Sequence, residues 1–265
     1  MYRKIKNYKI YFIDFLLIGF IIISSFLLLR NLSENLGYNW QFYRIWEYLI
    51  KKTENGYEFG ILIKGLFITL EVSAISLILS FIFGLFSALF SISNSFMLKL
   101  ISAFYVETIR NTPLLIQIFF NYFVISPIFN ISPFVTAILT LSLFEGAYAS
   151  EIIRGGINSI HSGQYEAARS LGLTEYQMYR FIVLPQALKN VAPPLASQGI
   201  SLIKDSSLVS TISVYELTLY GQAIVSETFL SFEVWFTIAL IYLIINVILS
   251  AGIKIFSKKV TRSAK

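Results

Sequence analysis

Polar side chains interrupt the long apolar runs of this chain. Three are ionisable and three are amides: Glu145, Lys204, Asp205, Gln117, Asn121 and Gln198. An ionisable group near the centre of a bilayer costs about 2.5–3.5 kcal/mol on insertion scales, so it usually faces a partner or a wet cavity. These groups could line a pathway for a small zwitterion, with carboxylates holding its ammonium group and cations or N–H donors its carboxylate. The alternative is that Lys204 pairs with Asp205 or Glu145 and only holds helices together.

The composition is that of a membrane protein. Of the 265 residues, 56% are hydrophobic and 14% are charged, against about 25% charged in soluble domains. The net charge of +6 does not indicate nucleic acid binding, because the charges cluster at the edges of apolar runs. The lack of cysteine excludes disulfides and thiolate metal sites, and a single histidine, His161, argues against a histidine metal site.

Six apolar segments approach the roughly 20 residues that a helix needs to cross a bilayer. They cover about residues 11–29, 62–90, 112–130, 134–153, 193–213 and 234–254. This pattern predicts an all-α polytopic membrane protein. The segment from Met97 to Ile109 is mixed in polarity and is predicted to run along the inner membrane surface. Pro193 and Pro194 are expected to begin the fifth span, where their missing N–H groups cost little.

The first apolar run could be a signal peptide cleaved near residue 30. However, its apolar part is longer than a usual signal core, and no small-x-small cleavage pattern follows it. We therefore expect a retained transmembrane helix.

Basic residues gather on one side of the predicted membrane. They precede the first span, occupy the fourth connection between spans and end the chain: Arg3, Lys4, Lys6, Lys9, Arg154, Arg169, Arg180, Lys189, Lys254, Lys258, Lys259, Arg262 and Lys265. The opposite side has Arg30, Arg44, Lys51 and Lys52. The positive-inside rule therefore predicts that both termini and this connection lie in the cytoplasm.

Two segments are expected on the outer side. Residues 38–48 are dense in Trp and Tyr, which favour the membrane interface, so we predict an interfacial helix, with a functional lid as the alternative. The connection from Val214 to Glu233 carries acidic but no basic residues. It could meet a partner protein or be a plain solvated loop.

The cytoplasmic connection, residues 155–190, has helix signals of its own. Ser159 to Leu171 is rich in helix-tolerant residues, and Gly172 is placed to end that helix in a left-handed turn. Thr174 followed by Gln177 has the spacing of a capping box for a second helix, which Pro185 should interrupt. The small side chains of Ala167 and Ala168 would let another surface approach closely.

The same connection resembles the loop by which permease subunits of ABC importers contact their ATPase. That pattern is Glu-Ala-Ala, three residues, Gly, nine residues and Ile-x-Leu-Pro. It is matched by Glu166-Ala167-Ala168, Gly172 and Ile182-Val183-Leu184-Pro185. The resemblance assigns ATPase coupling to Gly163, Glu166, Ala167, Ala168, Ser170, Leu171, Gly172, Leu184 and Pro185.

Three further segments resemble the polar amino acid branch of these permeases, which serves histidine, glutamine, glutamate, arginine and opines. They are Glu107 to Gln117, Gly146 to Ile157 and Ile203 to Leu208, so the resemblance covers about residues 60–255. Asn111 departs from the usual Gly, although Asn tolerates left-handed backbone. Glu145 is also less typical at its position, and a carboxylate there would favour a cationic side chain such as that of arginine or lysine.

The resemblance implies a type I ABC importer transmembrane domain with five core helices, to which this chain adds one N-terminal span. The expected parts are that span (1–30), an extracytoplasmic aromatic segment (31–60), the permease core (61–256) and a basic tail (257–265). The implied partners are a second permease subunit, identical or homologous, two ATPase subunits, an extracytoplasmic amino-acid-binding protein and membrane lipid. No nucleic acid is expected.

The implied function is ATP-driven import of a polar, possibly cationic, amino acid across a bacterial cytoplasmic membrane. The chain has no Gly-x4-Gly-Lys-Ser/Thr phosphate loop, so we expect no catalytic site and no cofactor of its own. ATP and Mg²⁺ would bind the partner ATPase. The alternatives are an ion- or proton-coupled secondary amino acid transporter, an intramembrane enzyme and a purely structural subunit, none of which accounts for the Glu166 loop.

Overall fold

A computed structural model describes residues 19–20, 23–24, 27, 38–54 and 56–262, the last seven without side chains. It divides into two units, residues 1–43 and 44–265. Most of the predicted N-terminal span lies outside the described residues.

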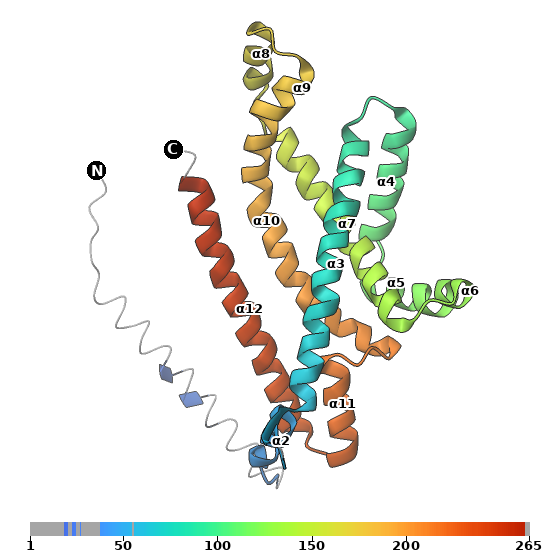
Figure 1. The fold of residues 1–265 in the computed structure, drawn as a ribbon, viewed down its shortest axis with the longest axis vertical. Helices are drawn as coiled ribbons and strands as arrows, with labels where there is room; N and C mark the ends of the chain where they lie inside the picture. Colours follow the sequence, from blue (N-terminus) through green and yellow to red (C-terminus); the bar gives the residue numbers. More distant parts are fainter. Residues whose placement is uncertain (1–18, 21–22, 25–26, 28–37, 55, 263–265) are drawn as a thin grey trace. The chain divides into compact units, whose positions relative to one another are not determined.

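Helices dominate the second unit (Figure 1). In chain order the elements are η1 Phe42–Arg44, α2 Trp46–Leu49, β1 Ile50–Thr53, β2 Gly56–Phe59, α3 Ile61–Ile92, α4 Phe96–Arg110, α5 Leu114–Phe120, η2 Asn121–Ile125, α6 Ser126–Phe129, α7 Pro133–Asn158, α8 Ser162–Ser170, α9 Glu175–Met178, η3 Tyr179–Val183, α10 Leu184–Asp205, η4 Ser206–Ile212, α11 Leu217–Thr228 and α12 Ser231–Arg262. The η2 and η3 segments are π-helical, and η4 is a 3-10 helix.

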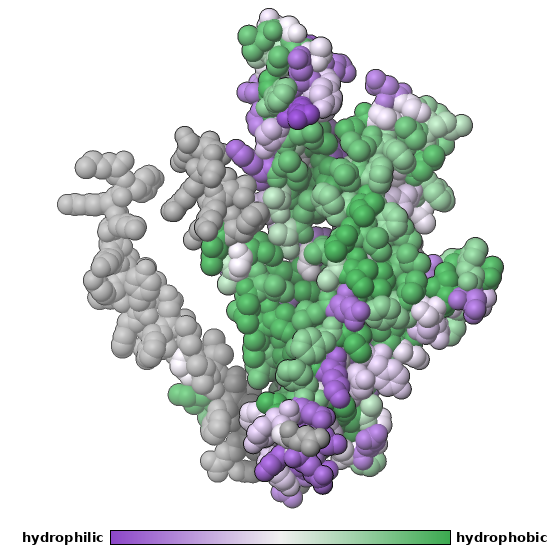
Figure 2. Space-filling model, in the orientation of Figure 1, coloured by the Kyte–Doolittle hydropathy of each residue, from purple (hydrophilic) through white to green (hydrophobic). Residues whose placement is uncertain are grey.

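Two described helices, α3 and α12, are each long and apolar enough to cross a membrane. Two further spans are possible if each of two bent helix pairs crosses as one unit: α4 with Leu114–Phe129, bent by 105°, and Glu175–Ile212 with α11, bent by 50°. The third predicted span is therefore not a straight helix over 112–130. Figure 2 shows apolar residues over α3 and α4, with hydrophilic residues gathered around α8 and around the hairpin.

The prediction that residues 97–109 form a surface helix is wrong. The α4 helix turns back after Ile92 and packs along α3 and α7 instead (Figure 1). Ser102 Oγ donates a hydrogen bond to the Ser87 carbonyl at 2.8 Å, and Tyr105 donates one to the Leu143 carbonyl at 2.6 Å. Two of the polar residues that gave the segment its mixed character, Ser102 and Tyr105, thus bond to neighbouring helices.

Close packing of α3 against α7 forms the centre of this unit. Gly84 of α3 faces Gly146 and Ala149 of α7, and a β-carbon at Gly84 would lie 2.6 Å from the Ala149 β-carbon and 2.9 Å from the Gly146 carbonyl oxygen. Small residues at such a contact let two helix backbones approach closely.

Replacing Gly84 by Ala is therefore expected to lower stability by about 1–3 kcal/mol, because the added methyl group overpacks a closed contact. Thermal unfolding of the purified protein would measure this. The control is Gly252→Ala, because a β-carbon at Gly252 meets nothing within 4 Å. Equal melting temperatures for the two variants would contradict the prediction.

Residues 38–48 do not form the one interfacial helix that was predicted. The described part forms only short helical turns at Phe42–Arg44 and Trp46–Leu49, and an antiparallel hairpin of β1 and β2 follows. Gly56 makes the reversal possible with φ +125°, and Thr53 Oγ1 donates to its carbonyl at 3.1 Å. The fold remains almost entirely helical, with this hairpin as its β-structure within the described residues.

The connection 214–233 is not a solvated loop. It contains α11, which packs against α3 and α12, and both Glu216 and Glu233 are fully buried. Glu216 caps α11 by accepting from Leu219 N–H at 3.0 Å, and its other oxygen accepts from Thr69 and Tyr242 hydroxyls at 3.2 and 3.1 Å. The acidic side chains therefore tie three helices together.

Candidate functional site

The Glu166 segment forms one end of the second unit, at the tip formed by α8 and α9 (Figure 1). His161 begins α8, and its Nδ1 accepts from Gly163 N–H at 3.0 Å. The helix ends as predicted: Gly172 has φ +74°, and its N–H donates to the Arg169 carbonyl at 2.9 Å. A residue with a β-carbon pays about 1–2 kcal/mol in this left-handed conformation, so the turn favours glycine.

The second helix starts as predicted but does not stop at Pro185. Thr174 and Gln177 form the complete capping box. The chain then passes through the π-helical η3 segment into α10, which runs to Asp205 with Pro193 and Pro194 in its interior. Pro185 lies in the first turn of α10, where its missing N–H is accommodated by the preceding π-turn. Pro193 and Pro194 therefore do not begin the helix, as predicted, but lie inside it.

The residues predicted to contact the ATPase differ in exposure. Glu166, Ala167, Ser170 and Leu171 are exposed, as are Gly172, Leu184 and Pro185, and Gly163 is half-buried. Ala168 is the exception. It is fully buried among Ile160, Met178 and Val183, so its small side chain lets α8 approach η3 within this chain rather than an external surface.

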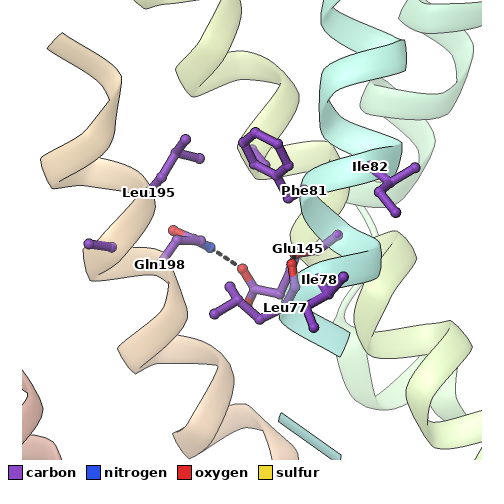
Figure 3. A pocket seen from close by; sticks show the side chains of 10 residues that line it. Leu77, Ile78, Phe81, Ile82, Glu145, Leu195 and Gln198 are labelled. Atoms are coloured by element: carbon purple, nitrogen blue, oxygen red, sulfur yellow. Dashed lines mark hydrogen bonds between the residues drawn. The ribbon is translucent and has the colours of Figure 1, made fainter. Parts of the chain in front are cut away.

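Two of the six predicted polar groups, Glu145 and Gln198, meet at one cavity between α3, α7 and α10. It has a volume of about 450 Å³ and is lined by Leu77, Ile78, Ser80, Phe81, Ile82, Glu145, Ala149, Leu195, Ala196 and Gln198. Figure 3 shows the Gln198 amide pointing at the Glu145 carboxylate across it. The two predicted pathway residues, distant in sequence, thus lie on one apolar-walled cavity.

Only one of the two Glu145 carboxylate oxygens accepts a hydrogen bond from an N–H or O–H group. Its side chain is 1% exposed, Oε2 accepts from Gln198 Nε2 at 2.5 Å, and Oε1 has no hydrogen-bond partner among the described residues. Asp205 is the neighbouring second carboxyl group: it repels Glu145 when both are charged and hydrogen-bonds to it when one of the two carries a proton. A buried carboxylate oxygen without a partner carries a desolvation cost, which a cationic group entering the cavity would remove.

Lys204 does not form the internal ion pair that was the alternative to a pathway role, although its charge acts on the Asp205 carboxylate. It is exposed, and the ion pairs within 4.0 Å in the described part of the chain are those of Glu151 with Arg110 and Arg154. Gln198, rather than Lys204, contacts Glu145.

Gln117 and Asn121 bond to the scaffold. Gln117 Nε2 donates to the Ile109 and Thr112 carbonyls at 2.8 and 2.9 Å, across the bend between α4 and α5. Asn121 Nδ2 donates to Thr140 Oγ1 at 3.0 Å. A pathway role for these two residues stays a prediction that no contact in the cavity supports.

A cluster that the sequence interpretation missed joins α4 to α7. Glu151 accepts two hydrogen bonds from Arg154, at 2.9 and 2.7 Å, and lies 3.5 Å from Arg110. The Arg110 guanidinium also lies 5.3 Å from the centre of the Tyr148 ring. Arg110 and Glu151 are 41 positions apart, so only the two family-like segments that contain them could have indicated that they meet.

Comparison with known proteins identifies the family of this chain. Residues 80–262 match the family described as binding-protein-dependent transport system inner membrane component. The chain belongs to this family. The permease of the glutamine transport system of Escherichia coli K12, GlnP, is 38% identical over 193 residues, covering 72% of this chain and 88% of that protein. The probable glutamine ABC transporter permease GlnP of Bacillus subtilis 168 is 44% identical over 192 residues, 70% and 87% of the two chains.

Solved structures agree with this membership. An amino acid ABC transporter crystallised with histidines superimposes with a TM-score of 0.72 and 36% identity, covering 75% of this chain and 94% of that one. The MetNI methionine ABC transporter, at 21% identity and a TM-score of 0.66, shows the shared fold. The family confirms the predictions of a type I importer domain and of a non-catalytic, multi-pass permease subunit of an ATP-driven importer, rather than a secondary transporter.

Proposed function

We propose that this permease imports a polar amino acid and that the cavity at Glu145 and Gln198 is part of its pathway. The observation that carries the proposal is the buried Glu145 carboxyl group on the wall of a cavity large enough for an amino acid: its Oε1 atom accepts no N–H or O–H from the described residues, and it faces a second carboxyl group, Asp205, with no cation. A substrate ammonium group would complete its hydrogen bonds, and the Gln198 amide holds the carboxylate in position. The names of the relatives, which specify glutamine or amino acids, support the substrate class.

The Glu166–Gly172 segment is proposed to contact a cytoplasmic ATPase that binds ATP and Mg²⁺. Its support is a glycine-dependent turn and exposed side chains at the free tip of α8 and α9. ATP binding can drive transport only if it favours one conformation over another, and this contact is where the difference in free energy would arise.

The proposed assembly contains two permease subunits, two ATPases and an external binding protein, with both termini of this chain in the cytoplasm. Purification of the complex through a tag on this chain shows whether the second permease subunit is another copy of this chain or a different protein.

Reconstitution tests the proposal. The permease complex in liposomes, with its ATPase and binding protein, should accumulate radiolabelled polar amino acids only when ATP is present on the ATPase side. Uptake that persists without the ATPase, driven by an ion gradient, would overturn the proposed coupling. ATP-driven uptake of solutes other than amino acids would overturn the substrate class alone.

A further inference from the structure

The β1–β2 hairpin has two chemically different faces. Its register pairs Ile50 with Phe59 and Lys52 with Tyr57. Directly opposite residues, and residues two apart on a strand, share a face. These four residues therefore form one face, which we call the aromatic face. Lys51 and Glu58, which are also opposite each other, belong to the other face.

The aromatic face is open in the described part of the chain. Ile50, Tyr57 and Phe59 are 49%, 78% and 61% exposed. An isolated two-stranded hairpin is marginally stable in water, so exposed apolar side chains on one of its faces point to an apolar surface that covers them.

That face is continuous with the apolar surface of α3. The Phe59 ring meets the Phe67 ring edge-on, with centroids 5.7 Å apart, and Phe67 is itself 54% exposed on a helix long enough to cross a membrane. Between the hairpin and the start of α3 lies a cavity of about 540 Å³, lined by Ile50, Tyr57, Glu58, Phe59 and Lys64. One wall is thus apolar, and the helix side presents an ammonium group.

We propose that the aromatic face rests on the membrane leaflet at the α2–β2 end and that this cavity takes the headgroup of an anionic phospholipid. Aromatic rings with polar tips favour the boundary between acyl chains and headgroups, which suits Tyr57 beside Phe59. The ammonium groups of Lys64 and Lys52 would attract the phosphate. Glu58 also lines the cavity and opposes the anion. Glu47 and Lys51 line an adjoining cavity of about 320 Å³ that shares Glu58, Phe59 and Lys64, so three lysines must outweigh two carboxylates.

A lipid fits better than a protein partner because the exposed apolar side chains of the hairpin join those of α3 through the Phe59–Phe67 contact, and α3 is long and apolar enough to cross a membrane. The hairpin lies outside residues 80–262, the part of the chain that matches the family.

Spin labelling tests the position of the face, and a chain without cysteine needs no background removal. Tyr57→Cys and Glu58→Cys place spin labels on two adjacent residues whose side chains lie on opposite faces of the hairpin. In the assembled transporter, in phosphatidylcholine–phosphatidylglycerol vesicles, the ratio of oxygen to nickel-chelate collision rates should be severalfold higher at position 57 than at position 58. Equal ratios, or a higher ratio at 58, would overturn the membrane contact.

Lipid selectivity tests the headgroup site separately. The preference of the complex for spin-labelled phosphatidylglycerol over phosphatidylcholine should fall by up to about fivefold in Lys64→Gln and in Lys52→Gln, since one lysine near an anionic surface contributes about 1 kcal/mol. Lys99→Gln, an exposed lysine of α4 near the opposite end of α3, should leave it unchanged. An equal loss in all three variants, or none in any, would show that the hairpin has no such site.

Discussion

Replacing Glu145 by Gln is expected to reduce ATP-driven amino acid uptake about ten- to hundredfold while the protein folds and assembles normally. The reason lies in the buried Oε1 atom, which has no partner among the described residues. A hydrogen bond to a charged group contributes about 1.5–3 kcal/mol, and 1.4 kcal/mol corresponds to a factor of ten in binding. Gln keeps the volume of Glu and one acceptor oxygen but removes the charge.

Uptake of arginine and of glutamine by the same liposomes measures which substrate group Glu145 contacts. If it holds a cationic side chain, Glu145→Gln lowers arginine uptake and spares glutamine uptake. If it holds the α-ammonium group, both fall together. Unchanged uptake of every amino acid that the wild type transports would show that Glu145 is not part of the pathway.

Thermal unfolding separates this role from a structural one. Removing an uncompensated buried charge should leave the melting temperature unchanged or raise it. A lower melting temperature with proportionally lower uptake would mean that the carboxylate mainly holds α7 to α10 through Gln198.

Replacing Gly172 by Glu is expected to abolish transport, with uptake lowered more than tenfold, although the chain still inserts into the membrane. The residue has φ +74°, where a side chain costs about 1–2 kcal/mol, and the bulky charge would project from the tip of the coupling segment. The measurements are uptake, co-purification of the ATPase and its stimulation by the permease. An ATPase that still co-purifies and is stimulated normally would contradict the prediction.

Two alanine variants isolate the effect of the backbone. A β-carbon meets nothing within 4 Å at either Gly172 or Gly155, but only Gly172 has a positive φ. Gly172→Ala should therefore lower ATPase stimulation, whereas Gly155→Ala should not. Gly172→Asn should be milder than Gly172→Ala, because Asn tolerates the left-handed region.

The turn at Gly172 and the capping box at Thr174 could be predicted because each depends on residues within a few positions. The long helices α3 and α12 followed from apolar length alone. The meeting of Glu145 with Gln198 could not be derived locally, because 53 positions separate them and helix packing brings them together.

The errors have a common cause. Proline and mixed polarity were interpreted as breaks or as surface segments. In the structure, the π-helical η3 segment directly before Pro185 accommodates the missing N–H. Backbone carbonyls of Ser87 and Leu143 accept hydrogen bonds from Ser102 and Tyr105 of α4. The burial of Ala168 depends on tertiary contacts, and the hairpin at 50–59 depends on the positive φ of Gly56. Neither can be predicted from composition.

The segments α9, η3 and α10 follow one another without a loop from Glu175 to Asp205, so they can move as one long helix. It packs against α7 where Val191 meets Gly156, a contact with no room for a β-carbon, which makes this point a suitable pivot. Gln198 lies about 10 Å beyond that point at 1.5 Å per residue. A tilt of about 6° there would carry it about 1 Å, enough to separate its amide from Glu145 and open the cavity wall.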